Sequence, residues 1–347
     1  MGIEINPGLD KSDFKIVYSP QHGADNIPVR TCLKRLGYDI VPVLAQCAPD
    51  PDYTNTKSPN PEVDASYELA IKLAKEVDAD VVAITDPDGD RLGVVAKHNG
   101  EYVLMSGNQS AAVYLEYILS QRKEKGTLPD NAVMYNTIVT SDLGELVARN
   151  YGVDVEKTLT GFKFIGDKIR KYEKTHEKQF IFGYEESYGC VVEDFVRDKD
   201  AVQAVLLAAE CGNYYKKQGK DLIDVLNELY AKYGTFKESQ IALAKAGAAG
   251  AARIKEMMDT LRQDKPTEIG GVKVVLSEDY ATSKRSDGTT IDLPKSNVLK
   301  YYLEDGSWIA ARPSGTEPKC KFYFSIKGKD AKDAADKTEV FHKAMME

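Results

Sequence analysis

The sequence predicts two consecutive α/β domains with mixed, largely parallel sheets, followed by a smaller α+β domain with an antiparallel sheet. Three observations support this fold class. Short apolar, β-branched runs alternate with segments of helical periodicity, as in α/β units. This strand and helix order restarts once, near residue 104. Beyond Gly234 the pattern changes to one Ala-rich helix and short strand-like pieces separated by Gly, Asp and Pro.

We expect a polar lead-in at residues 1–12 and the first α/β domain at 13–103. Its apolar runs predict strands, and its helical spacing ends at signals such as Gly37, a residue typical of helix C-caps. The loop at 49–61 is rich in Pro, Asn and Thr and shows no periodicity. The expected strands are 14–19, 38–43 and 80–85, and the expected helices are 30–36 and 62–77.

The second α/β domain is expected at residues 104–234 and the α+β domain at 235–347. In the second domain the pattern predicts strands at 132–135, 153–155 and 179–182, with helices at 109–121, 142–149, 200–217 and 222–232. In the third it predicts a helix at 246–261, strands at 272–276, 298–303, 308–311 and 321–326, and a closing helix from residue 330.

Composition excludes several classes of protein. The 347 residues are 42% hydrophobic and 29% charged, which is globular composition. A net charge of −8 argues against a nucleic-acid-binding surface over the whole chain. Apolar runs stay well below the roughly 20 residues that a membrane span needs, and the start does not resemble a signal peptide. Five cysteines without Cys-x-x-Cys spacing indicate reduced thiols, so we expect a cytoplasmic protein with no membrane partner.

Three carboxylates follow the third expected strand of the first domain. Asp86, Asp88 and Asp90 alternate in the loop DPDGDR, where ligands commonly bind at the carboxyl ends of strands. At a separation of about 4 Å and an effective dielectric near 20, each like-charge pair costs about 4 kcal/mol. Convergent carboxylates therefore indicate a hard divalent cation, Mg²⁺ or Ca²⁺, unless the loop is a solvated acidic turn. Arg91 either neutralises the carboxylates or faces a phosphate, and we favour the phosphate.

Two further loops carry groups suited to a phosphorylated sugar. Arg312 and the hydroxyls of Ser314 and Thr316 lie in RPSGTEPK, a turn that either binds phosphate or is a plain connection between strands. The loop GYEESYG, with Glu185 and Ser187, offers acceptors for sugar hydroxyls, although such loops are common on surfaces. Lys163 in TGFKFIG is either a site residue or an ordinary solvated lysine.

In this order, DPDGDR, GYEESYG and RPSGTEPK closely resemble the motifs of the α-D-phosphohexomutase family, nearest to its phosphoglucomutase and phosphopentomutase branch. SPNPE at 58–62, TGFKFIG at 160–166 and RDKD at 197–200 support the resemblance, which covers nearly the whole chain. It implies an isomerase that acts through a phosphoserine, a sugar bisphosphate and Mg²⁺.

The resemblance also implies roles for individual residues. The metal ligands match Asp86, Asp88 and Asp90, and catalytic positions match Arg91 and Lys163. Groups that hold the sugar match Glu185 and Ser187. The loop that grips the non-reacting phosphate matches Arg312, Ser314, Gly315 and Thr316.

One departure from the family is important. Its first domain of four carries Ser-His-Asn, whose serine is phosphorylated, and no Ser-His dipeptide occurs in this sequence. The resemblance therefore implies domains two to four of a phosphoglucomutase that interconverts glucose 1-phosphate and glucose 6-phosphate, truncated and inactive alone.

Several alternatives stay open. The intact protein could instead be a phosphopentomutase or a phosphomannomutase of the same family, or the chain could be a non-catalytic phosphosugar-binding protein. A haloacid-dehalogenase-type phosphatase with Asp86 as nucleophile would leave the other two loops unexplained.

Overall fold

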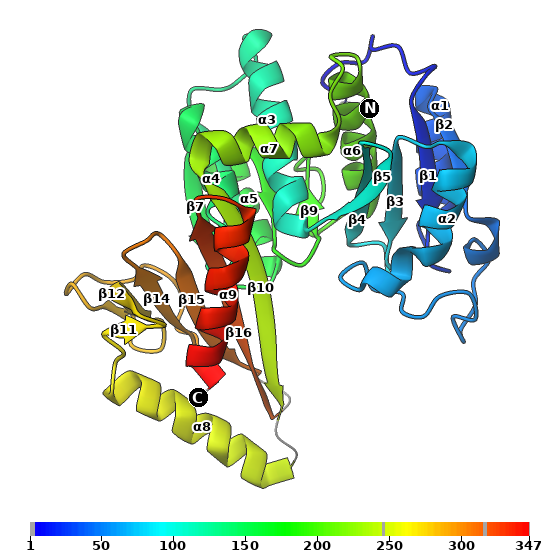
Figure 1. The fold of residues 1–347 in the computed structure, drawn as a ribbon. Coiled ribbons are helices and arrows are strands. Elements are labelled where there is room, and N and C mark those ends of the chain that lie inside the picture. Colours follow the sequence, from blue (N-terminus) through cyan, green and yellow to red (C-terminus); the bar gives the residue numbers. More distant parts are fainter. Residues whose placement is uncertain (1–3, 245–246, 315–317, 347) are drawn as a thin grey trace. The chain divides into compact units, whose positions relative to one another are not determined.

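The computed structural model describes residues 4–244, 247–314 and 318–346 (Figure 1). The chain divides into two compact units, unit 1 at Met1–Leu229 and unit 2 at Tyr230–Glu347. Unit 1 contains two sheets and unit 2 contains a third.

The first sheet of unit 1 combines parallel and antiparallel pairing in the order β2-β1-β3-β4-β5. Strands β2, β1 and β3 run parallel, because helices α1 and α2 provide the crossovers. Strands β4 and β5 continue the sheet as an antiparallel hairpin. The strands are β1 (Lys15–Ser19), β2 (Asp39–Pro42), β3 (Val81–Thr85), β4 (Leu92–His98) and β5 (Glu101–Met105), and the helices are α1 (Asn26–Leu36) and α2 (Glu68–Val77). Short 3₁₀ turns occupy Leu44–Gln46 and Asp64–Tyr67.

The second sheet of unit 1 has the order β7-β6-β8-β9, with only its β9 edge antiparallel among the described strands. Its strands are β6 (Ala132–Thr137), β7 (Asp154–Thr158), β8 (Gln179–Tyr184) and β9 (Cys190–Val191). The accompanying helices are α3 (Gly107–Glu124), α4 (Leu143–Asn150), α5 (Lys163–Thr175), α6 (Ala201–Lys216) and α7 (Leu222–Tyr233). Ile165 and Ile169 of α5 pack against Val133 and Tyr135 of β6.

Helix α6 holds the two sheets of unit 1 together. It contacts β3 and β4 of the first sheet and β9 of the second. Nearly every side chain of α6 is buried, in agreement with its apolar, alanine-rich sequence. Asp200 caps the helix by accepting hydrogen bonds from the backbone N–H groups of Val202 (2.9 Å) and Gln203 (3.2 Å). The helix therefore begins at a fixed point, close to the ends of both sheets.

The lead-in has no helix or strand over its described residues 4–12, but it is docked to the rest of unit 1. The carboxylate of Glu210, on α6, accepts the backbone N–H of Ile5 at 3.1 Å and that of Asn6. The Asn6 side chain donates to the hydroxyl of Tyr117 and to the amide oxygen of Gln121, each at 3.0 Å. Buried partners therefore satisfy these polar groups of Ile5 and Asn6.

Unit 2 is an antiparallel sheet in the order β10-β16-β15-β14-β12-β11, and β13 pairs with β12. Helix α9 packs along β10 and β16 (Figure 1). The core of unit 2 includes the buried side chains of Phe322, Phe324 and Tyr301. The elements are β10 (Thr235–Ala244), α8 (Gly247–Gln263), β11 (Glu268–Ile269), β12 (Val272–Asp279), β13 (Lys284–Arg285), β14 (Leu299–Leu303), β15 (Trp308–Pro313), β16 (Lys319–Gly328) and α9 (Ala331–Met346).

The predicted fold class is confirmed, with several local differences. The hairpin β4–β5, helix α5 and strand β10 were not expected, and α2 begins later than predicted, after a 3₁₀ turn. The domain boundaries at 13, 104 and 235 stay predictions. Within the described ranges, no helix has the length and apolarity to cross a bilayer.

Candidate functional site

The loop between β3 and β4 folds around the side chain of Asp86. Its Oδ1 accepts hydrogen bonds from the backbone N–H groups of Asp90 (3.1 Å) and Arg91 (2.9 Å). Gly89, between Asp88 and Asp90 in the sequence, has a φ of 76°, a left-handed conformation that glycine adopts readily. Carboxylate oxygens of Asp86, Asp88 and Asp90 consequently lie within 4.8 Å of one another. The structure thus brings the three aspartates selected from the sequence to one point.

This carboxylate trio has the chemistry of a divalent cation site. Burial raises the pKa of Asp86 to about 7; the backbone N–H of Arg91 opposes the shift, and the charges of Asp90 and Asp88 add to it. Asp88 is exposed, so the trio is open to solvent on one side. Hard oxygen donors that repel one another in this way fit Mg²⁺ or Ca²⁺, which would relieve the repulsion.

Arg91 lies among carboxylates in this structure. Its Nε is 3.5 Å from Asp86 Oδ2 and 3.5 Å from Asp90 Oδ1, and its Nη1 is 3.3 Å from Glu62 Oε1. Glu62 belongs to the SPNPE segment that the sequence analysis had noted. The geometry therefore agrees with the neutralising role that we had considered for Arg91, and its role toward a phosphate stays a prediction.

A fourth carboxylate, Asp25, which we had not expected from the sequence, lies beside the same loop. Asp25 directly precedes α1 and is 7% exposed. Burial raises its pKa to about 7, and the charges of Asp200, Asp88 and Asp90 add to the shift. A lone aspartate after His-Gly-Ala carries no recognisable pattern for a cation site, so the sequence did not single it out.

The GYEESYG loop holds Glu185 in a buried position. Glu185 Oε1 accepts the backbone N–H of Gly161 at 2.8 Å, and the side chain is 8% exposed. Burial raises its pKa, as does the charge of Glu186, against the opposing effect of the Gly161 N–H. Glu186 accepts from the hydroxyls of Thr137 (2.9 Å) and Thr140 (3.3 Å). Ser187, in the same loop, is half-buried.

Two contacts connect this loop to the carboxylate trio. The backbone N–H of Leu92, at the start of β4, donates to the carbonyl of Tyr188 at 2.9 Å. Lys199 extends between the loops, with its Nζ 3.0 Å from Asp90 Oδ2 and 5.6 Å from the ring centroid of Phe162. A Cβ atom on Gly189 would lie 2.1 Å from Lys199 Cδ, so a larger residue there would displace the lysine side chain from this position. The sequence had indicated only the RDKD stretch that contains Lys199.

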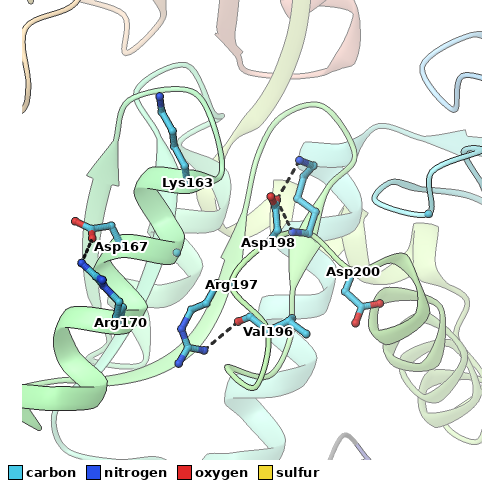
Figure 2. Close-up of a pocket in the computed structure, with 10 residues that line it drawn as sticks. Lys163, Asp167, Arg170, Val196, Arg197, Asp198 and Asp200 are labelled. Atoms are coloured by element: carbon cyan, nitrogen blue, oxygen red, sulfur yellow. Dashed lines mark hydrogen bonds and ion pairs between the residues drawn. The ribbon is translucent and has the colours of Figure 1, made fainter.

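A hollow of about 710 Å³ lies next to the trio in unit 1. It is lined by Gly89 of the trio loop, Lys163 at the start of α5, and residues 196–200 (Figure 2). Along α5, Asp167 and Arg170 lie 3.3 Å apart (Asp167 Oδ1 to Arg170 Nη2). Two segments selected from the sequence, DPDGDR and TGFKFIG, therefore face one cavity.

Lys163 differs from its expected setting. It is the first residue of α5, a helix that we had not expected, in which Ile165, Ile169 and Tyr172 form one buried face. Its side chain is exposed, and Nζ lies 5.0 Å from the ring centroid of Phe164. The lysine can thus reach a ligand in the hollow.

The third expected loop belongs to unit 2. Arg312 is the next-to-last residue of β15, and its Nη1 donates to the Tyr323 hydroxyl at 3.3 Å. The backbone N–H of Ser314 donates to the carbonyl of Lys319 at 2.8 Å, which closes the connection to β16. Gly315 and Thr316, the other two residues expected here, lie outside the described residues.

Comparison with known proteins shows which family shares these features. Sequence models described as "Phosphoglucomutase/phosphomannomutase, alpha/beta/alpha domain II", "alpha/beta/alpha domain III" and "C-terminal domain" match residues 4–100, 106–233 and 245–341. The chain belongs to the phosphoglucomutase/phosphomannomutase family. The resemblance inferred from the three motifs is confirmed.

Members of this phosphoglucomutase/phosphomannomutase family include relatives at 38% identity. A phosphoglucomutase of Staphylococcus haemolyticus (strain JCSC1435) matches 325 residues, 92% of this chain and 58% of the relative. One of Staphylococcus aureus (strain MRSA252) matches 336 residues, 95% of this chain and 60% of the relative. The chain thus spans about three fifths of the length of these curated relatives.

Solved structures of the family share the fold. A phosphoglucomutase from Paramecium, pp63/parafusin in its open form, matches 100% of this chain and 60% of its own, with 18% identity and a TM-score of 0.71. A phosphoglucomutase/phosphomannomutase family protein from Burkholderia thailandensis matches 99% and 63%, with 19% identity and a TM-score of 0.68. An N-acetylglucosamine-phosphate mutase in its substrate complex matches with a TM-score of 0.53 and 13% identity.

Proposed function

We propose that this chain provides the metal-binding and sugar-phosphate-binding parts of a phosphoglucomutase, an isomerase that interconverts glucose 1-phosphate and glucose 6-phosphate. The carboxylate trio, with its oxygens within 4.8 Å of one another beside a hollow of about 710 Å³, carries the proposal. Family membership and the relatives named phosphoglucomutase support it. Its partners are a phosphosugar substrate and a sugar bisphosphate.

Asp86, Asp88 and Asp90 would hold Mg²⁺. When bound, Mg²⁺ neutralises negative charge on a phosphoryl group during transfer. Arg91 offsets the repulsion between the carboxylates, and its guanidinium offers a fork to a phosphate once a cation takes over that task. Lys199 forms an ion pair with Asp90 and so competes with a cation for this carboxylate.

The other proposed residues bind the substrate. Lys163 faces the hollow, where its ammonium group can attract a phosphate. Glu185 and Ser187 would bind sugar hydroxyls, and the buried Glu185 is held in position by the N–H of Gly161. Arg312, Ser314, Gly315 and Thr316 would grip the phosphate that does not react.

The phosphoryl carrier would come from outside these residues. The 347 residues contain no Ser-His dipeptide, so they lack the phosphoserine motif of the family. A phosphoserine supplied separately would exchange its phosphoryl group with the sugar through a bisphosphate intermediate. The chain itself positions the reactants, which accounts for much of the acceleration in phosphoryl transfer.

Calorimetry with glucose 1,6-bisphosphate and Mg²⁺ tests the binding part of the proposal. We expect saturable binding of the bisphosphate that Asp88→Asn weakens and that an exposed control, Asp52→Asn, leaves unchanged. The same preparation should show no conversion of glucose 1-phosphate. Absence of binding would contradict the proposal, and enzyme-like turnover would contradict the external phosphoserine.

The sugar specificity requires a separate comparison. Glucose, mannose and pentose bisphosphates, titrated in parallel, distinguish a phosphoglucomutase from a phosphomannomutase or a phosphopentomutase. We expect the glucose compound to bind most tightly. Tighter binding of another sugar would reassign the substrate while leaving the metal and phosphate roles intact.

A further inference from the structure

The carboxyl group of Asp25 lies directly against the trio loop. A Cβ atom on Gly89 would lie 2.5 Å from Asp25 Oδ1, 2.7 Å from Cγ and 2.8 Å from Oδ2. Gly89 lies between Asp88 and Asp90 in the sequence. The Asp25 carboxyl group therefore occupies the space that a side chain at position 89 would need. A larger residue at position 89 would displace it.

One oxygen of this carboxyl group has no partner in the described part of the chain. Asp25 Oδ2 is buried, and no donor of the described residues lies within hydrogen-bond distance. Asp25 also precedes α1 without capping it through its side chain. A buried carboxylate oxygen left unpaired is costly, and such an atom in a native structure points to a ligand or an ordered water.

The surrounding backbone holds Asp25 in this position. The N–H of Ala24 donates to the carbonyl of Pro87 at 2.9 Å, so the segment before α1 is tied to the trio loop. A Cβ atom on Gly23 would lie 2.5 Å from Pro87 Cα, which shows how closely the two segments approach. On the other side, the N–H of Ala201, at the start of α6, donates to the carbonyl of Gly89 at 3.1 Å.

We propose that Asp25 is a fourth carboxylate of the cation site, a positioning residue that strengthens cation binding by the trio from behind Gly89. This inference rests on the proposed function, because it requires a divalent cation at Asp86, Asp88 and Asp90. The oxygens of Asp25 are not among those that lie within 4.8 Å of one another, so Asp25 would act without binding the cation directly. Mg²⁺ usually keeps several waters, and carboxylates in an outer layer accept hydrogen bonds from such waters and orient the ligands.

Calorimetric titration of the purified chain with Mg²⁺ and with Mn²⁺ tests this role. We expect Asp25→Asn to weaken the affinity for both cations about 10-fold or more, the range found when outer carboxylates of metal sites are removed. Glu210→Gln is the matched control, because Glu210 is also a buried carboxylate in unit 1 but binds residues 5 and 6. This control should bind both cations as the unaltered chain does.

Cation-dependent stabilisation separates a role in cation binding from a purely structural one. The melting temperature in Mg²⁺ should exceed that in chelator by less for Asp25→Asn than for the unaltered chain. This difference does not depend on whether the substitution itself changes the melting temperature in chelator. Unchanged affinity in Asp25→Asn, with affinity lost in Asp86→Asn, would overturn this inference and leave the proposed cation site standing. Absence of cation binding by the unaltered chain would overturn both the inference about Asp25 and the proposed cation site.

Discussion

The carboxyl group of Asp25 makes the stability of the cation-free chain depend on pH in a direction opposite to that of an ordinary ion-paired aspartate. Burial raises its pKa from 3.8 to about 7. Between these two values the folded chain retains a proton that the unfolded chain has released, so unfolding becomes easier as pH rises. Replacement by asparagine, which is neutral at every pH, removes this effect.

The structure gives the size of the expected difference. At about 1.4 kcal/mol per pKa unit, full ionisation of Asp25 costs about 4 kcal/mol of folding free energy. Part of that cost, about 2 kcal/mol, is present at pH 5, and the rest appears by pH 8. The stability of Asp25→Asn relative to the unaltered chain should therefore rise by about 2–3 kcal/mol between pH 5 and pH 8.

Guanidinium unfolding in chelator at the two pH values measures this gain. Circular dichroism should follow the transition, because the single tryptophan, Trp308, lies in unit 2 and Asp25 in unit 1. Asp52→Asn, which removes one exposed charge, controls for net charge. A stability difference between Asp25→Asn and the unaltered chain that is equal at pH 5 and pH 8, or smaller at pH 8, would refute the reasoning.

Three more substitutions have expected outcomes. Lys199→Met should lower the stability of the cation-free chain by about 2 kcal/mol, since it breaks a half-buried ion pair. It should also tighten Mg²⁺ binding, because Asp90 loses a competing cation. Unfolding measures the first effect and calorimetry the second, and weaker Mg²⁺ binding would contradict this prediction. Glu185→Gln should weaken the binding of glucose 1,6-bisphosphate about 10-fold, as loss of a charge-assisted hydrogen bond does. The stability of the chain should not fall. Unchanged affinity would exclude Glu185 from the sugar site. Gly89→Ala should destabilise unit 1 by about 1–3 kcal/mol because residue 89 has a positive φ. Part of that cost should disappear when Asp25→Ala is added, because the new methyl group then has room. Strict additivity of the two changes in unfolding free energy would argue against a contact between residues 25 and 89.

Some elements that we missed had signals in the sequence. The turn between β4 and β5 contains Asn99 and Gly100, with φ values of 50° and 84°, and Asn-Gly is the dipeptide typical of tight hairpins. Helix α5 places Ile165, Ile169 and Tyr172 at helical spacing, although the glycines of TGFKFIG suggested a turn. Ala242 and Ala244 lie at the end of strand β10, where pairing with β16 outweighs the helix propensity of alanine.

The sequence by itself determined the α/β class, the two halves of unit 1 with their buried strands, and the positions of three loops that carry charged or hydroxyl groups. It could do so because burial imposes periodicity, and because a carboxylate at every second loop position is a local pattern. The convergence of Asp86, Asp88 and Asp90 was also foreseeable, since a short loop confines them. Only the tertiary structure placed Asp25 behind Gly89 and Lys199 between the two loops of unit 1. Their roles arise from contacts between segments distant in the chain, and a single aspartate or lysine has no periodicity to indicate such a contact.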